Sequence, residues 1–444
     1  MSEPNITGHP KAEALREELA RALFSNSKLV AYAILDGAAN PSLLDHLYDG
    51  KRPEFECLYR GELEPDMAEC APYIVKLEAD TPFCDWLIRQ CWGNHWGIFV
   101  LSRENINAVR QHFRKLNMVY DPESNNPLLF RYYDPRVLCL FLPSCDEEQT
   151  AAFYGPVQAF FAEAEEGGNL REFIRNEPTA EGWAGPETIL FIRPKQMELF
   201  RQAASQRFEN EMVAHCQDFA PILCRVIGKQ QLRLAVRSGI ERAGGYGFTY
   251  RGSIRLFLEL MFLFGSAFDS DPQYSWATRI LHGNAPQMDR AGNLYDQVLD
   301  YQEKVSGPDG LNNREALRNL VFFVGQPNDF SSQNFGTSMI MEMSNIFPQK
   351  ANYIGKEALV ALIRDSCDKA KALGFTTSKG YALMVALTFV FGHGCTDDPL
   401  YPWMSSTLKD ETVREPNARA TQLEQETLAW LNQILAIASE KVSP

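Results

Sequence analysis

The chain has 444 residues, of which 45% are hydrophobic and 23% charged, and its formal net charge at pH 7 is −14. Because one domain holds roughly 150 residues, this length predicts two or three globular domains, each with room for a core. The acidic charge argues against a function that rests on neutralising nucleic-acid phosphates or anionic lipid headgroups. We therefore expect no nucleic-acid partner.

The first clear pattern is "KAEALREELARALF", a charged amphipathic helix within residues 1–27. It lacks the basic start, apolar stretch and cleavage site of a signal peptide. The longest apolar runs, "LELMFLFG" and "YALMVALTFVFG", are shorter than the ~20 residues that a membrane span requires. We expect a cytoplasmic protein without a membrane anchor.

Residues 28–194 alternate strand-length apolar runs with helical patterns, which predicts an α/β lobe with a mixed sheet. The runs expected as strands are residues 28–37, 55–59, 73–77, 96–102, 127–133 and 188–193. Several are apolar on both faces, as is typical of a sheet covered by helices. Residues 157–176 form two runs around an acidic Gly-Gly turn and predict a hairpin at the edge of the sheet.

Polar residues mark the expected helix starts in this lobe. Asn40 and Thr81 each precede a proline, which suits the first helical position because its missing N–H leaves no donor unsatisfied. Ser102 is expected to open a helix over residues 103–117. The apolar stripe of that helix consists of Ile106, Val109, Phe113 and Leu116.

From about residue 195, strand signals disappear and helical periodicity dominates, so we expect an all-α region and an α+β fold for the whole chain. Shifting the sequence by 127 residues aligns residues 227–281 with 354–408 without a gap, and 19 of 55 positions are identical. A duplication of this length predicts one helical unit built twice. We place the first repeat at residues 195–310 and the second at residues 311–444.

Each copy carries the same order of signals. An amphipathic helix ends at a glycine that supplies a left-handed stop, a threonine two residues later can cap the next helix, and that strongly apolar helix runs to a second glycine. These residues are Gly247, Thr249 and Gly265 in the first copy and Gly374, Thr376 and Gly392 in the second.

An Asp-Pro-x-Tyr-x-Trp loop follows the apolar helix in both copies. Its residues are Asp271, Pro272, Tyr274 and Trp276 in the first copy and Asp398, Pro399, Tyr401 and Trp403 in the second. The proline fixes the turn, the aspartate can accept backbone N–H groups, and the rings can lie over the apolar helix. Because the positions around the loop differ between the copies, we favour a structural corner over a partner-binding edge and over a catalytic loop.

The two apolar helices differ in one respect. The first carries Arg255 and Glu259, an i,i+4 pair suited to water, whereas the second has Ala382 and Ala386 at the equivalent positions. The second helix is therefore apolar nearly all round. Either it is buried more deeply between the copies, or Ala382 and Ala386 lie in a groove for a hydrophobic segment of a partner.

No pattern in the sequence indicates catalysis, a metal or a cofactor: no GxSxG, HExxH, Walker or GxGxxG motif occurs, and the histidines lack paired ligand spacing. The densest polar group is "LFRYYDPRVLCLFLP". Asp134 there can cap a helix that begins at Pro135, with Arg131 and Arg136 flanking the carboxylate and lowering its pKa. This arrangement favours an ion-pair corner over a binding surface, and both over a general base.

Six segments between residues 30 and 157 resemble, in order, the effector adaptors or chaperones of type VI secretion systems, the Tap/TEC family. These segments are "YAILDGA", "CLYRGE", "APYIVKL", "WGIFVLS", "LLFRYYDPRVL" and "FYGPV". The most specific marker comprises Arg131, Tyr133, Asp134, Pro135 and Arg136, and Gly155-Pro156 is the second marker. The helical half is similar to the carboxy-terminal regions of some members, including the "GF" and Asp-Pro-x-Tyr-x-Trp elements.

The resemblance implies a cytoplasmic adaptor without catalytic residues. Such a protein binds one toxic effector and helps to load it onto the valine-glycine-repeat spike protein, VgrG, so the expected partners are a cognate effector and VgrG. Two other classes remain open: a toxin-binding immunity protein, and a hydrolase that uses Asp134 or Cys395.

Overall fold

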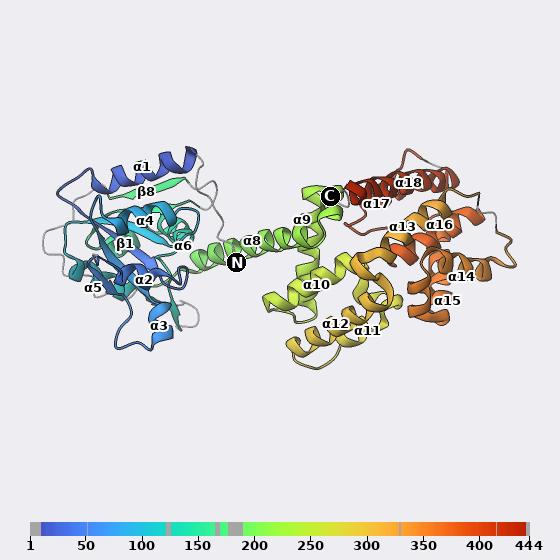
Figure 1. The fold of residues 1–444 in the computed structure, drawn as a ribbon, viewed down its shortest axis with the longest axis horizontal. Helices are drawn as coiled ribbons and strands as arrows, with labels where there is room; N and C mark the ends of the chain where they lie inside the picture. The colour runs from blue at the N-terminus through green and yellow to red at the C-terminus, as the bar shows by residue number, and fades with distance from the viewer. Residues whose placement is uncertain are drawn as a thin grey trace. The chain divides into compact units, whose positions relative to one another are not determined.

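The computed structural model describes residues 10–50, 52–120, 126–164, 169–175, 190–327, 330–413 and 415–440. The chain divides into two compact units, Met1–Ala204 and Ser205–Pro444, and the boundary falls inside helix α8 (Pro194–Phe219) (Figure 1). The first unit holds a sheet with helices, and the described part of the second is helical. The expected fold class is therefore confirmed.

The first unit is built on a six-stranded sheet with the order β2-β3-β1-β4-β7-β8. Its strands are β1 (Val30–Asp36), β2 (Phe55–Cys57), β3 (Pro72–Leu77), β4 (Gly97–Ser102), β7 (Val157–Glu163) and β8 (Leu170–Ile174). Every neighbouring pair is antiparallel. The edge strand β8 pairs with β7, which confirms the predicted hairpin pairing; its Gly-Gly turn lies outside the described residues.

A separate two-stranded ribbon consists of β5 (Met118–Tyr120) and β6 (Pro127–Leu129). The strand predicted over residues 127–133 is therefore too long, because the chain leaves the ribbon after Leu129. The strand predicted over residues 188–193 is wrong for its described part, where Phe191 forms only one isolated bridge to Tyr120. Three-residue strands such as β5 are too short to show a period of two.

Helices cover both faces of the six-stranded sheet, as its doubly apolar strands predict. Ala31 and Ala33 of β1 face a core shared with α1, α2 and α4, whereas Tyr32 and Ile34 face a core shared with α5, α6 and α7. In Figure 1, α1 also lies beside β8. The helices are α1 (Pro10–Phe24), α2 (Leu43–Tyr48), α3 (Pro65–Glu69), α4 (Pro82–Gln90), α5 (Ile106–Leu116), α6 (Pro135–Phe141) and α7 (Glu147–Tyr154).

Of the helix starts predicted at Asn40, Thr81 and Ser102, one is confirmed and two shift along the chain. Thr81 caps α4 as predicted. Ser102 instead ends β4, and Asn105 caps α5. Asn40 accepts hydrogen bonds from the backbone N–H and hydroxyl of Ser42, so α2 begins two residues later than predicted. The predicted apolar stripe of α5 is buried throughout.

The second unit shows the duplication in its helix boundaries. Helices α9 (Pro221–Gly245), α10 (Arg251–Phe264) and α11 (Ser275–Leu281) each begin and end 127 residues before α15 (Pro348–Ala372), α16 (Ser378–Phe391) and α17 (Pro402–Leu408). The remaining helices are α12 (Gln287–Tyr301), α13 (Leu311–Val324), α14 (Phe335–Ile346) and α18 (Pro416–Glu440). Together with α8, they enclose one continuous apolar core that spans both copies.

The predicted glycine stops are confirmed by φ values of 73° at Gly247 and 81° at Gly374. The caps predicted at Thr249 and Thr376 are wrong, since α10 has no side-chain cap and Thr377 caps α16. Both threonine hydroxyls accept instead from an amide side chain in the first turn of α12 or α18. Among the described helices, none combines the length and hydropathy that a bilayer span requires.

Candidate functional site

The first candidate site is the segment between β6 and α6, which carries the most specific sequence marker. The Arg131 guanidinium donates to the carboxylate of Asp36, the last residue of β1. The sequence predicts Arg131 beside Asp134, and its charge does lower the pKa of Asp134, but its hydrogen bond goes to Asp36, which is 2% exposed. Tyr133 is buried and its hydroxyl interacts with Tyr59, so three of the marker segments meet here.

Asp134 forms the ion-pair corner that the sequence predicts. Its Oδ1 accepts from the backbone N–H of Arg136 at 2.9 Å, and the guanidinium of Arg136 reaches both oxygens at 2.9 and 2.7 Å. Burial alone would raise the pKa of this carboxyl, but the bonds and charge of Arg136 lower it below its usual value. Pro135 begins α6 as predicted. Asp134 is therefore held as a paired carboxylate, a poor general base.

The second marker, Gly155-Pro156, lies where α7 turns into β7. Gly155 has φ of 51°, and a side chain there would place its Cβ 2.4 Å from the ring of His112. The carbonyl of Pro156 accepts from the hydroxyl of Ser102 at 2.7 Å. Burial lowers the pKa of His112 to about 4, so this imidazole is neutral at pH 7. Gly155 and Pro156 therefore fix the turn between α7 and β7 against α5 and β4.

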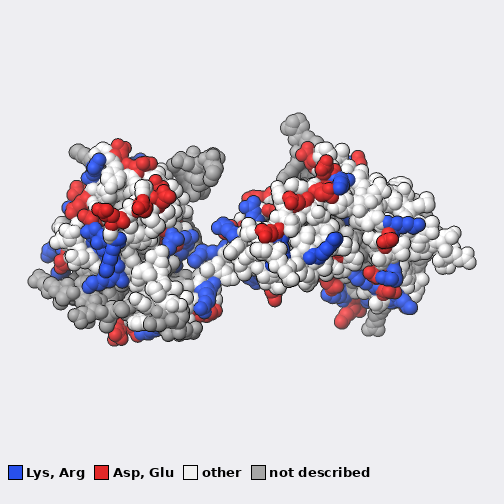
Figure 2. All heavy atoms as spheres, turned by 90° about the horizontal axis from the view of Figure 1, so that it is seen from below, with Lys and Arg blue, Asp and Glu red and all other residues white. Residues whose placement is uncertain are grey.

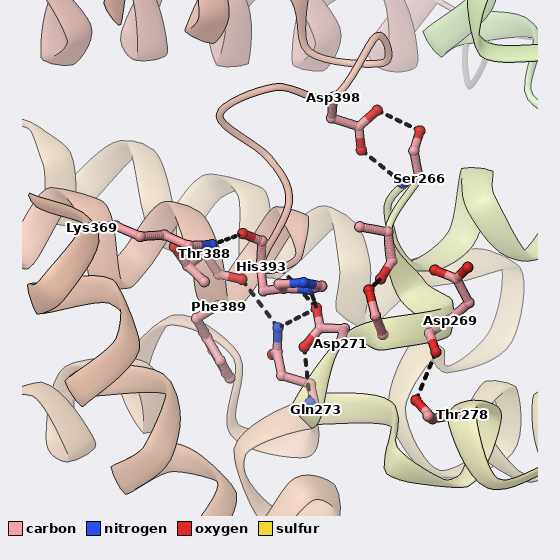
Figure 3. A network of polar contacts seen from close by, with 12 residues as sticks. Ser266, Asp269, Asp271, Gln273, Thr278, Lys369, Thr388, Phe389, His393 and Asp398 are labelled. Atoms are coloured by element: carbon pink, nitrogen blue, oxygen red, sulfur yellow. Dashed lines mark hydrogen bonds and ion pairs between the residues drawn. The ribbon is translucent and has the colours of Figure 1, made fainter. Parts of the chain in front are cut away.

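The second candidate site is formed by the two Asp-Pro-x-Tyr-x-Trp loops, which exchange contacts between the copies (Figure 3). Asp271 accepts from Gln273 in its own loop at 2.9 Å and from the backbone N–H of His393, in the other copy, at 2.8 Å. Asp398 accepts from the backbone N–H of Ser266 in the first copy at 2.7 Å. Because Ser266 and His393 are equivalent positions, the contact is reciprocal about a pseudo-twofold axis.

Two cationic side chains at equivalent positions also donate hydrogen bonds at this contact between the copies. Arg242 of α9 donates to the carbonyl of Ser266, and Lys369 of α15 donates to the carbonyl of His393. Two residues beyond each apolar helix, Ser266 or His393 therefore donates its N–H to the other copy's aspartate and accepts with its C=O from its own copy's cation. These bonds fix the two chain segments that follow the apolar helices.

The glycines at these helix ends bring the two copies into backbone contact. Gly265 has φ of 94°, and a Cβ there would lie 2.5 Å from the carbonyl oxygen of Phe391. Gly392 has φ of 96°, and its Cβ would lie 2.7 Å from the carbonyl oxygen of Phe264. Any side chain at either position is therefore excluded by conformation and by space.

The prolines and three of the four aromatic rings of the loops lie as the sequence predicts, whereas Trp403 packs on α18. Pro272 and Pro399 occupy turns closed by a 2.9 Å bond from the tyrosine N–H to the aspartate C=O. Tyr274 packs on Phe264 with 4.5 Å between ring centroids. The other aromatic pairs are Trp276 with Phe264, Tyr401 with Phe391, and Trp403 with Trp430.

The groove predicted at Ala382 and Ala386 is wrong. Both residues are 0% exposed and belong to the core of the second unit. Helix α16 packs against α15, α14, α18 and α13, which leaves no face for a partner at these positions. The alternative explanation, deeper burial of the second apolar helix, accounts for its composition.

The surroundings of Cys395 do not favour a nucleophile. The thiol is 1% exposed, and burial raises its pKa to about 12, so almost no thiolate forms at pH 7. The imidazole of His393 lies 3.4 Å from Asp271. Within the described residues, no group of three or more His, Cys, Asp or Glu side chains is placed to hold a metal ion.

Several important residues escape sequence reasoning. Asp36 and Ser266 look ordinary in the sequence, and only the fold brings them to Arg131 and Asp398. Lys350 is a buried lysine in α15 that no motif marks. It did carry one signal, because the alignment of the copies places it on an apolar residue, Leu223.

We predict that the two loop aspartates respond oppositely to pH. Burial raises the pKa of both carboxyls, but His393 beside Asp271 brings that pKa below 3.8, whereas Asp398 stays above 3.8. A carboxyl whose pKa is lowered by folding stabilises the fold above pH 3.8, and this stabilisation is lost as the pH falls. A carboxyl whose pKa is raised by folding stabilises the fold at low pH, and this stabilisation is lost as the pH rises. Asp271→Asn should therefore cost about 2 kcal/mol at pH 7 and less in acid.

The matched variant Asp398→Asn should cost less than Asp271→Asn at pH 7, because ionisation of Asp398 already opposes folding there. Urea unfolding of both variants between pH 3 and 7, followed by hydrogen exchange in α10 and α16, measures the difference. Equal losses at every pH would show that neither charge matters.

Part of the first unit matches a known family model. Residues 31–152 match the family model described as a domain of unknown function (DUF4123), a domain associated with type VI secretion effector adaptors (Tap/TEC). The match confirms the resemblance for the five segments inside this range; "FYGPV" (residues 153–157) lies just beyond it. No curated protein and no solved structure matches the chain.

Proposed function

We propose, from the DUF4123 domain at residues 31–152, that this chain is a cytoplasmic adaptor that binds a cognate type VI secretion effector and helps to load it onto VgrG. The family match is the observation that carries the proposal, because this family is generally one of non-catalytic adaptors. The paired Asp134 and the buried Cys395 agree with a role in binding.

The charge distribution fits a protein partner better than a polyanion. On the face shown in Figure 2, acidic and basic side chains are interspersed and separated by wide uncharged areas, without a continuous basic stripe. The net charge of −14 would repel nucleic acid over longer distances. Uncharged surface with a mixed polar rim is the usual character of protein interfaces.

We propose that the effector is recognised on the first unit, at a surface that we term the ribbon patch. It consists of three large apolar side chains around the β5–β6 ribbon: Met118, Leu129 and Phe191, which are 43%, 52% and 46% exposed. Met118 lies directly opposite Leu129, and Phe191 bridges to Tyr120 on the same strand as Met118. Adjacent exposed apolar residues of this size are typical of an interaction site.

The ribbon patch makes the proposal testable with surface variants. The double variant Met118→Glu/Leu129→Glu should weaken binding of the effector at least tenfold, because two charges would have to be desolvated in the interface. Its unfolding temperature should stay near that of the native chain, since both side chains are exposed. The matched control is Phe322→Glu in α13, 70% exposed on the second unit, which should bind normally.

The measurement is isothermal titration of the purified chain with a toxin from the same type VI gene cluster. Loss of binding in Phe322→Glu but not in the double variant would move recognition to the helical unit. Failure of the native chain to bind any such toxin would contradict the proposed function.

Co-expression separates the adaptor from an immunity protein. We expect the chain to raise the amount of folded effector in the cell and to be required for its secretion. Rescue of the cell from an already active toxin, without any effect on secretion, would instead indicate an immunity protein.

A further inference from the structure

The second unit contains a cavity of about 450 Å³ that is partly open to solvent. Its wall is mainly apolar and aromatic, with contributions from α9, α10, α13, α15, α16 and α18. Among the residues that line it are Phe347, Phe391, Trp430 and Ile434. This volume falls in the range of about 300 to 1,000 Å³ that is common for small-molecule sites.

Both copies of the repeat line the cavity. Equivalent residues line it from both sides: Leu263 with Val390, and Tyr274 with Tyr401. The third equivalent pair, Leu223 and Lys350, breaks the symmetry, because one copy offers a leucine and the other an amine. Since the first copy folds with leucine at this place, the repeat does not need a charge there.

Lys350 is an incompletely satisfied buried cation. It is 1% exposed, and its Nζ donates to the carbonyl of Phe389 at 2.5 Å. Nζ also lies 5.3 Å from the ring of Tyr274 and 5.2 Å from that of Phe389. An ammonium has three donors, and among the described residues no carboxylate lies within ion-pair distance of this one. Burial lowers the pKa of this amine to about 8, and the charge of Asp271, which lies beyond ion-pair distance, opposes that effect only in part. A ligand that supplied a directly bonded carboxylate would stabilise the buried ammonium.

The apolar wall of the cavity restricts the kind of ligand that can bind there. A peptide would bury several backbone N–H and C=O groups against a surface with few polar partners, which is unfavourable. An aliphatic chain has no such groups and gains free energy by leaving water. The part-buried Arg314 also lines the cavity and adds a second positive charge. The wall and the cations together fit an apolar chain that ends in one negative group.

We infer that this cavity binds a medium-chain aliphatic carboxylate, with its chain against the aromatic wall and its carboxylate on the Nζ of Lys350. The proposal goes beyond the adaptor function and does not depend on effector binding. Of the three equivalent pairs described above, Leu223 and Lys350 differ in charge, and a bound carboxylate explains why that charge is present.

The test is isothermal titration of the full chain with sodium dodecanoate below its micelle concentration. The native chain should bind one equivalent, and Lys350→Leu should bind at least tenfold more weakly while remaining folded, because Leu223 occupies the same place in the first copy. The matched control Lys356→Leu removes an exposed lysine of the same helix and should bind like the native chain.

One further variant and one further ligand test the proposal. Leu317→Trp fills the cavity from α13 without removing the amine, and it should also abolish binding. Dodecan-1-ol, which lacks the charge, should bind at least tenfold more weakly than dodecanoate. The proposal is overturned if the native chain does not bind dodecanoate, if Lys350→Leu binds it equally well, or if an acetylated Leu-Leu-Phe peptide binds and dodecanoate does not.

Discussion

Replacing Gly265 with alanine should destabilise the helical unit by about 4 kcal/mol or more. The backbone at Gly265 has φ of 94°, which an L side chain rarely adopts, and its Cβ would lie 2.5 Å from a backbone oxygen of the other copy. Relief of this clash requires the ends of α10 and α16 to separate. That movement would also break the bonds from Asp398 to Ser266 and from Asp271 to His393.

Because the two copies meet symmetrically, Gly392→Ala should destabilise the helical unit as much as Gly265→Ala does. Gly252→Ala, in the first turn of α10, is the matched control: no atom lies within 4 Å of its Cβ, so stability should be unchanged or slightly higher. Denaturant unfolding, with hydrogen exchange to locate the loss in α10 and α16, gives the result. Gly265→Ala with native stability would show that the copies do not meet as described.

The substitution Ala386→Glu should be almost as damaging, with a loss of about 4 kcal/mol. Ala386 is 0% exposed in α16, so the substitution buries a carboxylate and overfills a packed core. The equivalent residue of the first copy is Glu259, which lies near the surface beside His215 and Arg255. A glutamate is therefore tolerated at this position in one copy only.

The matched control for Ala386→Glu is the reverse change, Glu259→Ala, which should cost only about 1 kcal/mol because it removes a partly exposed ion pair. Thermal unfolding of the two variants compares the copies directly. If Ala386→Glu melts like the native chain, α16 has an accessible face, and the groove predicted from the sequence would have to be reconsidered.

Much of the architecture is readable from local pattern. The duplication is visible because packing preserves glycines, aromatics and apolar positions at fixed spacing, and the helix boundaries repeat with the same shift of 127 residues. The buried strands of the first unit are visible for a similar reason, as burial on both faces leaves continuous apolar runs. Several errors fall at the ends of elements: Asn105, and not Ser102, caps α5, and α10 begins without a side-chain cap from Thr249.

What the sequence does not reveal is which distant groups meet. The sequence assigns Asp271 a turn within its own loop, but one of its three side-chain hydrogen bonds comes from the other copy, which depends on how two helices cross. Arg131 likewise donates its side-chain hydrogen bond to Asp36, 95 residues away, and not to the nearby Asp134. Lys350 shows the same limit, since a lysine on a helix is ordinarily solvated and only the fold encloses this one.

The central claim, that this chain is an adaptor between an effector and VgrG, is tested most directly by reconstitution. The purified chain, a cognate effector and VgrG would be mixed in pairs and all together, and analysed by size-exclusion chromatography with light scattering. We predict that the effector joins VgrG in a stable complex only when the chain is added. Equal association of effector and VgrG without the chain, or failure of the chain to bind the effector, would contradict the account.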